Sequence, residues 1–342
     1  DGRGLALSSG KEKGIENLFY REDFRRATME ETGELVFPHR MIEFYHQGFL
    51  DALDAKGIAD FKPKVVIDYA FSAAAPIFPW LLGKLGCEVV ALNAYMDETK
   101  LTKTQEEFQA ALKQLSDIVP TLKANFGVLF DAGAEKIFVV DEKGHLLAGT
   151  ELLALFSLYT YNRHKGAKTV VPVNGSHVLD DLAKANGGKI QRTRINYYSL
   201  MEAATQKDVA FVGESDGGFI FPSFAPFMDA MMSTAKLMEF IALEGKPISH
   251  YLDQIPKKIQ ISQKVPCSWE MKGTIMRHLI EDTEGEKREL IDGIKVTQNG
   301  SSIMILPDAD MALFHVTAEA ENEKKAQDLV TAYVDKIKKW QG

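Results

Sequence analysis

The sequence is poor in cysteine, in excess positive charge and in long apolar runs, and each lack excludes a class of protein. Its 2 cysteines, Cys87 and Cys267, are too few and too far apart for a zinc site or a disulfide framework. We therefore expect reduced thiols in a cytoplasmic protein. The net charge of −8 argues against nucleic acid as a partner, since nucleic-acid binders usually carry a basic face. No window approaches about 18 consecutive apolar residues, so we expect neither a membrane span nor a membrane partner.

What the sequence does contain is the composition of an ordinary globular protein. Hydrophobic residues make up 45% of the 342 residues and charged residues 26%, which argues against disorder or a coiled coil. At about 150 residues per domain, this length allows two domains, or three small ones. The chain begins Asp-Gly-Arg-Gly, with neither an initiator methionine nor a signal peptide, and we expect a fragment of a longer polypeptide. Residues 1–40 are rich in charge, and we expect a connector with one or two short helices there.

Apolar spacing predicts two successive α/β units after residue 40. Strands rich in β-branched residues at 64–71 and 88–92 flank an apolar helical stretch that ends at Leu85. Strand, helix and strand at this spacing form a βαβ unit, which implies a parallel sheet. The other expected elements are helices at 41–53, 103–118, 150–162, 177 onward, 198–205 and 226–243, and strands at 126–131, 137–141, 169–173, 189–193 and 209–213.

The pattern changes after Pro256 and predicts a small α+β domain with an antiparallel sheet. We expect Trp269 to pack in its core, close to Cys267. The expected elements are strands at 258–262, 288–297, 302–306 and 312–319 and helices at 269–281 and 322–340.

Three polar loops follow predicted strands, which is where α/β proteins keep their chemistry. In the first loop, Asp131, Gly133 and Glu135 occupy alternate positions. Carboxylates so placed can converge on Mg²⁺, which prefers oxygen ligands. A tight hairpin turn that uses Gly133 for a positive φ is the favoured alternative.

The second loop, residues 213–218, is rich in glycine and in polar side chains. Its glycines allow a ligand to approach the backbone closely. Glu214, Ser215 and Asp216 can hydrogen-bond sugar hydroxyls. A polar, glycine-rich turn with no ligand is an equally good interpretation.

The third loop, residues 307–311, and the segment around Ser176 predict structure rather than chemistry. Loops that cradle phosphate carry Gly, Ser, Thr or Arg, whereas this one carries Asp308 and Asp310, so we expect a hairpin turn. Ser176 and His177 are adjacent and cannot generally act as nucleophile and base on each other. Ser176 is better interpreted as a helix N-cap. The other histidines form no ligand grouping, so we expect no transition-metal site.

The order of these blocks and loops resembles the α-D-phosphohexomutase family, which includes phosphomannomutases and phosphoglucomutases. Residues 130–141, 210–222 and 301–320 look like its metal loop, sugar loop and phosphate loop, and residues 65–70 with 85–90 look like the opening of its second domain. The resemblance implies the fold class α/β, with two phosphohexomutase-like α/β/α domains and a small C-terminal α+β domain like the TATA-box-binding protein. The implied bounds are 1–40 for a connector and the remnant of a preceding domain, 41–147 and 148–256 for the two α/β/α domains, and 257–342 for the last.

Residues 16–26 are especially similar to a subgroup in which mutase-like domains follow a sugar-phosphate nucleotidyltransferase in one polypeptide. Its members are usually labelled mannose-1-phosphate guanylyltransferases. This resemblance implies a covalently attached nucleotidyltransferase as partner and a sugar phosphate or sugar nucleotide as ligand. A homo-oligomer is compatible with the sequence.

The metal and sugar loops depart from the family's motifs. The metal motif Asp-Gly-Asp-x-Asp-Arg keeps Asp131 but has Gly133, Glu135 and Lys136 at its later positions, so Mg²⁺, the implied cofactor, is expected to bind weakly or not at all. Asp131 and Glu135 remain as candidate ligands. The sugar motif Gly-Glu-x-Ser-Gly-His is kept in part, and the resemblance implies a sugar-binding set of Gly213, Glu214, Asp216 and Gly217.

The phosphate loop departs furthest. Of the motif Arg-Pro-Ser-x-Thr-Glu-Pro only Pro307 matches, and the phosphoserine loop Ser-His-Asn-Pro does not occur in the chain. We therefore predict no catalytic and no phosphate-binding residue, and a catalytically degenerate module that is regulatory or structural for the attached nucleotidyltransferase. The alternative is an active sugar phosphomutase whose phosphoserine domain lies outside this fragment. A purely structural scaffold is a third hypothesis.

Overall fold

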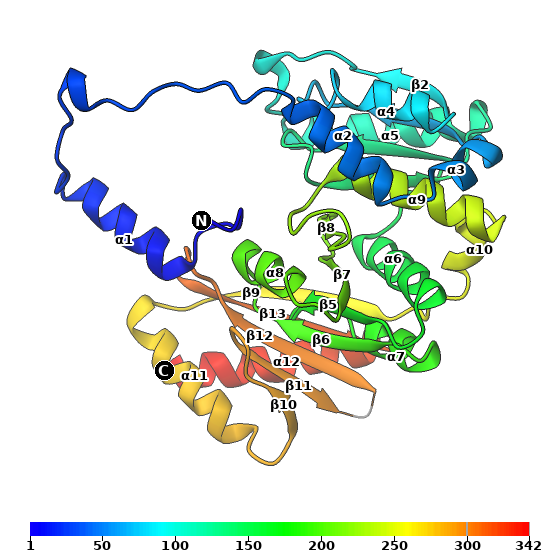
Figure 1. Ribbon diagram of the computed structural model, residues 1–342. Helices are drawn as coiled ribbons and strands as arrows, with labels where there is room; N and C mark the ends of the chain where they lie inside the picture. The colour runs from blue at the N-terminus through cyan, green and yellow to red at the C-terminus, as the bar shows by residue number, and fades with distance from the viewer. Residues whose placement is uncertain (299, 342) are drawn as a thin grey trace. The chain divides into compact units, whose positions relative to one another are not determined.

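The computed structural model describes residues 1–298 and 300–341, whose strands form three sheets (Figure 1). In the first sheet β1 is parallel to β2 and β3, and β4 makes an antiparallel hairpin with β3. Helix α5 (Gln105–Thr121) packs Leu115 and Val119 against this sheet. The order is β2-β1-β3-β4, with strands β1 (Lys64–Asp68), β2 (Glu88–Leu92), β3 (Phe126–Phe130) and β4 (Ile137–Asp141).

The close packing of α5 depends on a glycine in β3. A Cβ on Gly127 would lie 2.5 Å from Val119 Cγ2 and 2.8 Å from Leu115 Cδ1. Any side chain at this position would push the helix away from the sheet, because protein interiors are close-packed.

The second sheet has the order β6-β5-β7-β8, with β5 parallel to β6. Helix α6 (Gly149–Arg163) precedes it and buries every residue from 152 to 161, as expected of a helix covered on all sides. The other elements are β5 (Lys168–Pro172), α7 (Val178–Ala185), β6 (Lys189–Thr193), α8 (Tyr197–Ala204), β7 (Val209–Gly213) and β8 (Phe219–Ile220).

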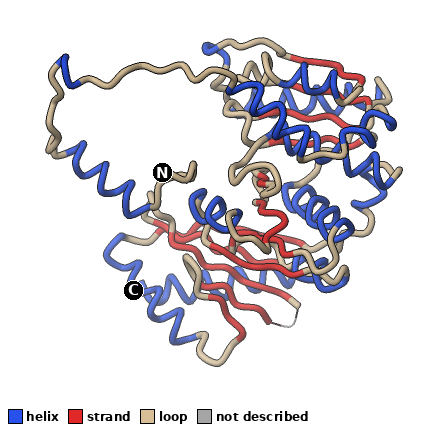
Figure 2. The backbone as a smooth tube through the Cα atoms, in the orientation of Figure 1, coloured by secondary structure: helices blue, strands red, loops and turns tan. Residues whose placement is uncertain are grey.

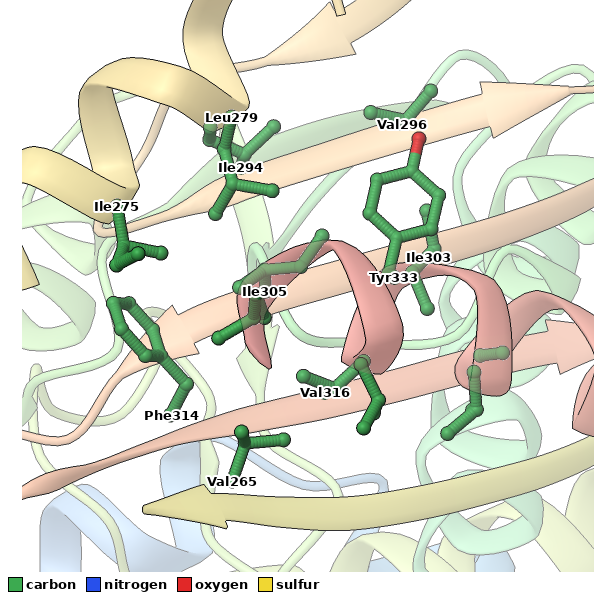
Figure 3. Close-up of a cluster of buried hydrophobic side chains, with 14 of the residues drawn as sticks. Val265, Ile275, Leu279, Ile294, Val296, Ile303, Ile305, Phe314, Val316 and Tyr333 are labelled. Atoms are coloured by element: carbon green, nitrogen blue, oxygen red, sulfur yellow. The ribbon is translucent and has the colours of Figure 1, made fainter. Parts of the chain in front are cut away.

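The third sheet is antiparallel, and its order is β10-β11-β12-β13-β9. Its strands are drawn in red in Figure 2. Helices α11 (Trp269–Asp282) and α12 (Glu323–Gln341) cover one face. Ile275 and Leu279 of α11 and Tyr333 of α12 pack onto apolar side chains of the sheet (Figure 3). The strands are β9 (Ile259–Pro266), β10 (Lys287–Glu289), β11 (Ile294–Gln298), β12 (Ser301–Pro307) and β13 (Leu313–Ala320).

The remaining helices precede or connect the strands of these sheets. Helix α1 (Ser9–Tyr20) buries none of its residues, and a long loop broken only by the 3₁₀ turn η1 (Met29–Glu31) follows it (Figure 2). The rest are α2 (Met41–Asp51), α3 (Ala55–Phe61), α4 (Phe78–Lys84), η2 (Glu98–Lys100), α9 (Ala230–Glu244) and α10 (Ile248–Leu252).

The chain divides into two compact units, each made of separated stretches. Unit 1 comprises residues 1–147, 197–210 and 216–249, and unit 2 comprises 148–196, 211–215 and 250–342. Within the described residues, no helix combines the length and the apolar character that crossing a bilayer requires.

The expected elements are confirmed, with few exceptions. Strand β1 ends at Asp68 although a strand was expected to residue 71, because Ala70 and Phe71 have positive φ angles of 49° and 60°, which a strand does not allow. Helix α4 begins at Phe78, whereas the apolar stretch starts near residue 72. The short elements α3, α10 and β8 were not predicted. The prediction of Trp269 in the core is wrong, because its side chain is 52% exposed and lies under the Lys272 ammonium, 3.6 Å from the ring centroid.

Candidate functional site

The predicted metal loop is a tight hairpin turn between β3 and β4 in unit 1. The Asp131 Oδ1 atom accepts the backbone N–H groups of Glu135 at 2.8 Å and Lys136 at 3.0 Å. Ala134, rather than Gly133, takes the positive φ, at 53°. The carboxylate of Asp131 thus holds the turn together, as Asp side chains often do in loops.

The predicted sugar loop meets this turn through residues 216–218. Lys136 and Gly218 form an isolated antiparallel β-bridge, and the Ile137 N–H donates to the Gly217 carbonyl at 3.0 Å. The Lys136 ammonium also pairs with the Asp216 carboxylate. Gly217 has a φ of 99°, and a Cβ there would lie 2.5 Å from the Ile137 carbonyl oxygen, so only glycine fits. A β-bridge, a backbone hydrogen bond and an ion pair therefore connect two loops whose paired residues, Lys136 and Asp216, are 80 positions apart in the sequence.

The start of helix α9 supports the same turn. The Ala230 N–H donates to the Ala134 carbonyl at 2.9 Å, and the Asp229 side chain caps the helix by accepting the Met232 N–H at 2.8 Å. The Tyr45 hydroxyl donates to the other Asp229 oxygen at 2.7 Å. Burial raises the pKa of Asp229 and that of the Tyr45 hydroxyl. Sequence reasoning missed both residues, although an Asp before a long apolar helix is an N-cap signal.

The loop has fewer carboxylate ligands for a magnesium ion than the family resemblance implies. Asp131 and Glu135 flank Gly133, where a Cβ would lie 3.8 Å from Asp131 Oδ2 and 3.4 Å from Glu135 Cγ. Across residues 1–298 and 300–341, no three His, Cys, Asp or Glu side chains group as a metal site would require. The second carboxylate of the family motif is the missing one, because Gly133 stands at its position.

The remainder of the predicted sugar loop lies in unit 2. Gly213 ends β7 and is buried, and Glu214 is partly exposed. The carbonyl of Ser215 abuts the start of α6 so closely that a Cβ on Gly149 would lie 1.5 Å from its oxygen. Gly149 therefore fixes how near the loop can approach the helix, a requirement that the sequence did not reveal.

A polar cavity of about 330 Å³ lies in unit 2 between the loop after β7 and strands of the third sheet. Its walls carry hydroxyl, amide and imidazole groups with few apolar side chains. The Ser262 and Thr317 hydroxyls lie 2.8 Å apart on neighbouring strands. Such neutral groups bind sugar hydroxyls, which both donate and accept hydrogen bonds. The lining residues are Asn174, Ser215, Gln260, Ser262, Met304, Leu306, His315 and Thr317.

The loop at 307–311 is closed by its own carboxylate. Asp308 Oδ1 accepts the backbone N–H groups of Asp310 and Met311, both at 2.8 Å, and Oδ2 lies 2.7 Å from His315 Nε2. The His315 hydrogen bond and the Asp310 N–H lower the pKa of Asp308 to about 2. These N–H groups therefore have an internal carboxylate as partner, as in the turns that Asp side chains form with the backbone two and three residues on.

Buried polar contacts join the segment after β5 to the third sheet within unit 2. Lys295 Nζ donates to the carbonyls of Val173 at 3.0 Å and Gly175 at 2.8 Å, and burial lowers the pKa of this ammonium to about 8. The His177 ring lies 2.9 Å from Thr297 Oγ1.

The geometry also separates Ser176 from the His177 ring. Ser176 Oγ accepts the N–H of Val178, the first residue of α7, at 3.0 Å. The His177 ring instead contacts Asp180 and Thr297. Ser176 therefore serves the helix start, one residue before the N-cap, and forms no catalytic pair.

Comparison with known families matches two regions of the chain. Residues 43–144 match phosphoglucomutase/phosphomannomutase, alpha/beta/alpha domain II, and residues 148–259 match domain III of that family. A protein named phosphoglucomutase/phosphomannomutase from Thermococcus kodakarensis is 31% identical over 326 residues, covering 95% of this chain and 71% of that protein. Phosphoglucosamine mutase from Methanocaldococcus jannaschii is 28% identical over 342 residues, covering 98% and 75%.

Solved structures share the fold. A phosphoglucomutase/phosphomannomutase family protein from Burkholderia thailandensis superposes with a TM-score of 0.78 at 20% identity, over 98% of this chain and 72% of that one. N-acetylphosphoglucosamine mutase from Aspergillus fumigatus, solved with GlcNAc-6P and magnesium, gives a TM-score of 0.63 at 14% identity, over 90% and 72%.

Proposed function

Because the chain belongs to the phosphoglucomutase/phosphomannomutase family, we propose that it uses this fold to bind a sugar phosphate or sugar nucleotide without transferring a phosphoryl group. The observation that carries the proposal is the Asp308 carboxylate, which occupies the N–H groups of its loop. A phosphate arriving there would have to displace an ionised carboxylate that is already hydrogen-bonded. Hydrogen bonds to an ionised carboxylate are stronger than those between neutral groups, so this displacement is unfavourable.

The metal loop supports the same proposal. Phosphoryl transfer depends on positioning and on electrostatic stabilisation of the phosphoryl oxygens, in which the metal has a large part. One oxygen of the Asp131 carboxylate already accepts hydrogen bonds from two N–H groups, and Gly133 has no side chain that could bind a metal ion. We propose that Mg²⁺ binding is weakened or lost.

The ligand's sugar would bind in unit 2. The cavity beside Ser215 offers hydroxyl and amide groups for sugar hydroxyls, and Gly213 and Glu214 precede it on the same loop. Asp216 and Gly217, the other predicted sugar-binding residues, remain part of the proposal. Because Asp216 pairs with Lys136, its carboxylate would have to share that partner with a ligand.

The partner and domain assignments belong to the proposal as well. An attached nucleotidyltransferase, with this chain as its regulatory or structural module, is supported by the likeness of residues 16–26 alone. The likeness of the last domain to the TATA-box-binding protein, the domain bounds, a homo-oligomer, the absence of nucleic-acid and membrane partners and a cytoplasmic location stay predictions.

Calorimetric titration tests the binding role. Mannose 1-phosphate, mannose 6-phosphate, glucose 1-phosphate and GDP-mannose are each titrated with and without Mg²⁺. We expect micromolar binding that Mg²⁺ does not change. Thr317→Val should weaken it about 3- to 10-fold, since one neutral hydrogen bond contributes about 0.5–1.5 kcal/mol. Thr331→Val, on the exposed side of α12, is the matched control. Absence of binding, in a chain shown to be folded, would favour a scaffold.

The alternative function is an active sugar phosphomutase. It is favoured by the extent of the likeness, because 95% of this chain aligns with a protein named as a mutase. An assay for conversion of a sugar 1-phosphate to the 6-phosphate by the intact parent polypeptide discriminates the two. Activity there that requires Mg²⁺ and Asp131 would overturn our proposal and establish the alternative.

A further inference from the structure

A second cavity, of about 460 Å³, lies in unit 1 and shares no residue with the predicted metal or sugar loops. We infer that it binds the phosphate group of a small phosphate ester whose organic part is flat and apolar. This inference goes beyond the proposed function. The lining residues are Phe71, Asn93, Thr99, Lys100, Thr102, Lys103, Glu107, Ala110, Ala111 and Gln114.

The position of the cavity is one that α/β proteins use for ligands. Phe71 and Asn93 follow the carboxyl ends of β1 and β2, the neighbouring parallel strands of the first sheet. Ligands of open α/β sheets bind outside these ends. One face of α5 supplies the opposite wall, through residues 107, 110, 111 and 114.

The charge that argues for an anionic ligand is on Lys103. Its side chain is half-buried and lines the cavity, and over residues 1–298 and 300–341 it has no hydrogen-bond or ion-pair partner. Lys100 is held at the same cavity by the Tyr95 hydroxyl at 2.9 Å and by Asp97 at 3.3 Å. Lys103 is thus a lining cation whose ammonium is available to a negative group of a ligand, since ammonium groups form strong hydrogen bonds with phosphate.

The carboxylates of Glu107 and Asp97 are held by partners other than Lys103. Glu107 Oε2 accepts the Thr104 N–H at 2.8 Å in the capping box of α5. Asp97 accepts the Thr99 N–H at 3.1 Å and pairs with Lys100. Both acidic groups near the cavity are thus committed to partners of their own.

The cavity has a rigid apolar wall next to its cations. Phe71 has a φ of 60° and Asn93 a φ of 50°, conformations that non-glycine residues adopt mainly where surrounding contacts enforce them. The buried Asp68 enforces them by accepting the Ala70 N–H at 2.9 Å and the Asn93 amide at 3.0 Å. The Phe71 ring, with the methyl groups of Ala110 and Ala111, offers a flat organic group an apolar surface.

Titration of the full chain with two probes tests the inference. Inorganic phosphate reports the anion site alone, and phenyl phosphate adds a flat apolar group. We expect phenyl phosphate to bind several-fold more tightly than inorganic phosphate. Lys103→Met should weaken both about tenfold or more, because it removes a charged hydrogen-bond donor. Lys113→Met, at an exposed lysine of α5 outside the cavity, should change neither.

A cavity-filling variant separates the two halves of the site. Ala110→Leu should abolish the advantage of phenyl phosphate while leaving inorganic phosphate unchanged. Equal binding by wild type and Lys103→Met, or no binding of either probe, would overturn the inference. Neither result bears on the proposed function, because Thr317→Val tests that site with different residues and different ligands.

Discussion

Gly133 occupies the position at which one more carboxylate would complete a three-carboxylate loop. Its φ is not in the left-handed region, and the nearest atoms to a Cβ there belong to Glu135 and Asp131. A side chain at this position therefore meets neither backbone strain nor a rigid neighbour, and its carboxylate would stand between the other two.

We predict that Gly133→Asp binds Mg²⁺ about tenfold more tightly than the wild type, because the added carboxylate supplies an oxygen ligand and a negative charge. Calorimetric titration with Mg²⁺ measures the change. Gly133→Ala is the control for the backbone effect. If the Asp and Ala variants bind Mg²⁺ equally, the loop is not a latent metal site.

Asp308 makes stability depend on pH in an acidic window. Its pKa in the folded chain, about 2, lies below the value of about 3.9 in an unfolded chain. Folding therefore favours the ionised form of Asp308. Its contribution to the free energy of unfolding is present above about pH 4 and is lost as the pH falls through about 2.

Asp308→Asn should accordingly have a lower free energy of unfolding than the wild type at pH 6. This difference between variant and wild type should become smaller between about pH 4 and pH 2. Urea denaturation at several pH values measures it. Asp310→Asn, an exposed neighbour in the same loop, is the matched control. A gap that does not vary over this range would contradict the role we assign to the carboxylate.

At the scale of elements, α5 shows how a helix and a strand are matched in shape. Gly127→Ala places a methyl group 2.5 Å from Val119 Cγ2 and 2.8 Å from Leu115 Cδ1. We expect a loss of about 1–3 kcal/mol in the free energy of unfolding, the usual effect of overpacking. Chemical denaturation gives the value.

The control for this prediction is another glycine. Gly273, within α11, has no atom within 4 Å of an added Cβ, so Gly273→Ala should leave stability unchanged or raise it by up to about 1 kcal/mol. Equal effects at the two sites would show that α5 can move off the sheet without cost.

The order of elements could be predicted because each carries its own periodicity. The strands β1 and β2 are short β-branched runs, and α12 has an apolar stripe. Trp269 could not be placed in this way, since apolar spacing does not show that its exposed ring lies under the Lys272 ammonium. The contact of α6 with Ser215 was likewise unpredictable, because Gly149 and Ser215 are far apart in sequence.

At the scale of the molecule, unit 2 joins stretches that are distant in the chain. The Lys295 ammonium of β11 donates hydrogen bonds to the carbonyls of Val173 and Gly175, in the segment that follows β5. We therefore expect β5 and β12 to open together, with equal free energies in native-state hydrogen exchange.

Lys295→Ala should break this coupling. It removes one donor from each of the Val173 and Gly175 carbonyls, although the Gly175 carbonyl keeps Arg192 Nη1 at 2.8 Å. We expect a cost of about 1–3 kcal/mol, and the third sheet should then exchange faster than β5. Lys287→Ala, exposed on β10, is the control. Equal protection of β5 and β12 in the Lys295 variant would mean that other contacts couple them.

The family could be predicted from the sequence, and the comparisons confirm it, because its loops stand in a fixed order along the chain. The contacts that hold these loops in place could not be predicted from the sequence. Tyr45 and Asp229 are 184 residues apart, and only the fold shows that their hydrogen bond steadies the start of α9 beside the loop at 131–136. Whether Gly213, Glu214, Asp216 and Gly217 bind a sugar, and Asp131 and Glu135 a metal, stays a prediction.

The carboxylate of Asp308 behaves as a tethered competitor. A ligand attached to its own site by a short stretch of chain has an effective concentration far above the concentrations of free solutes. Millimolar phosphate in the surroundings would then leave the loop at 307–311 unchanged, so its shape would not vary with the supply of phosphate. Under the proposed function, such a module would respond to the sugar part of its ligand and not to free phosphate.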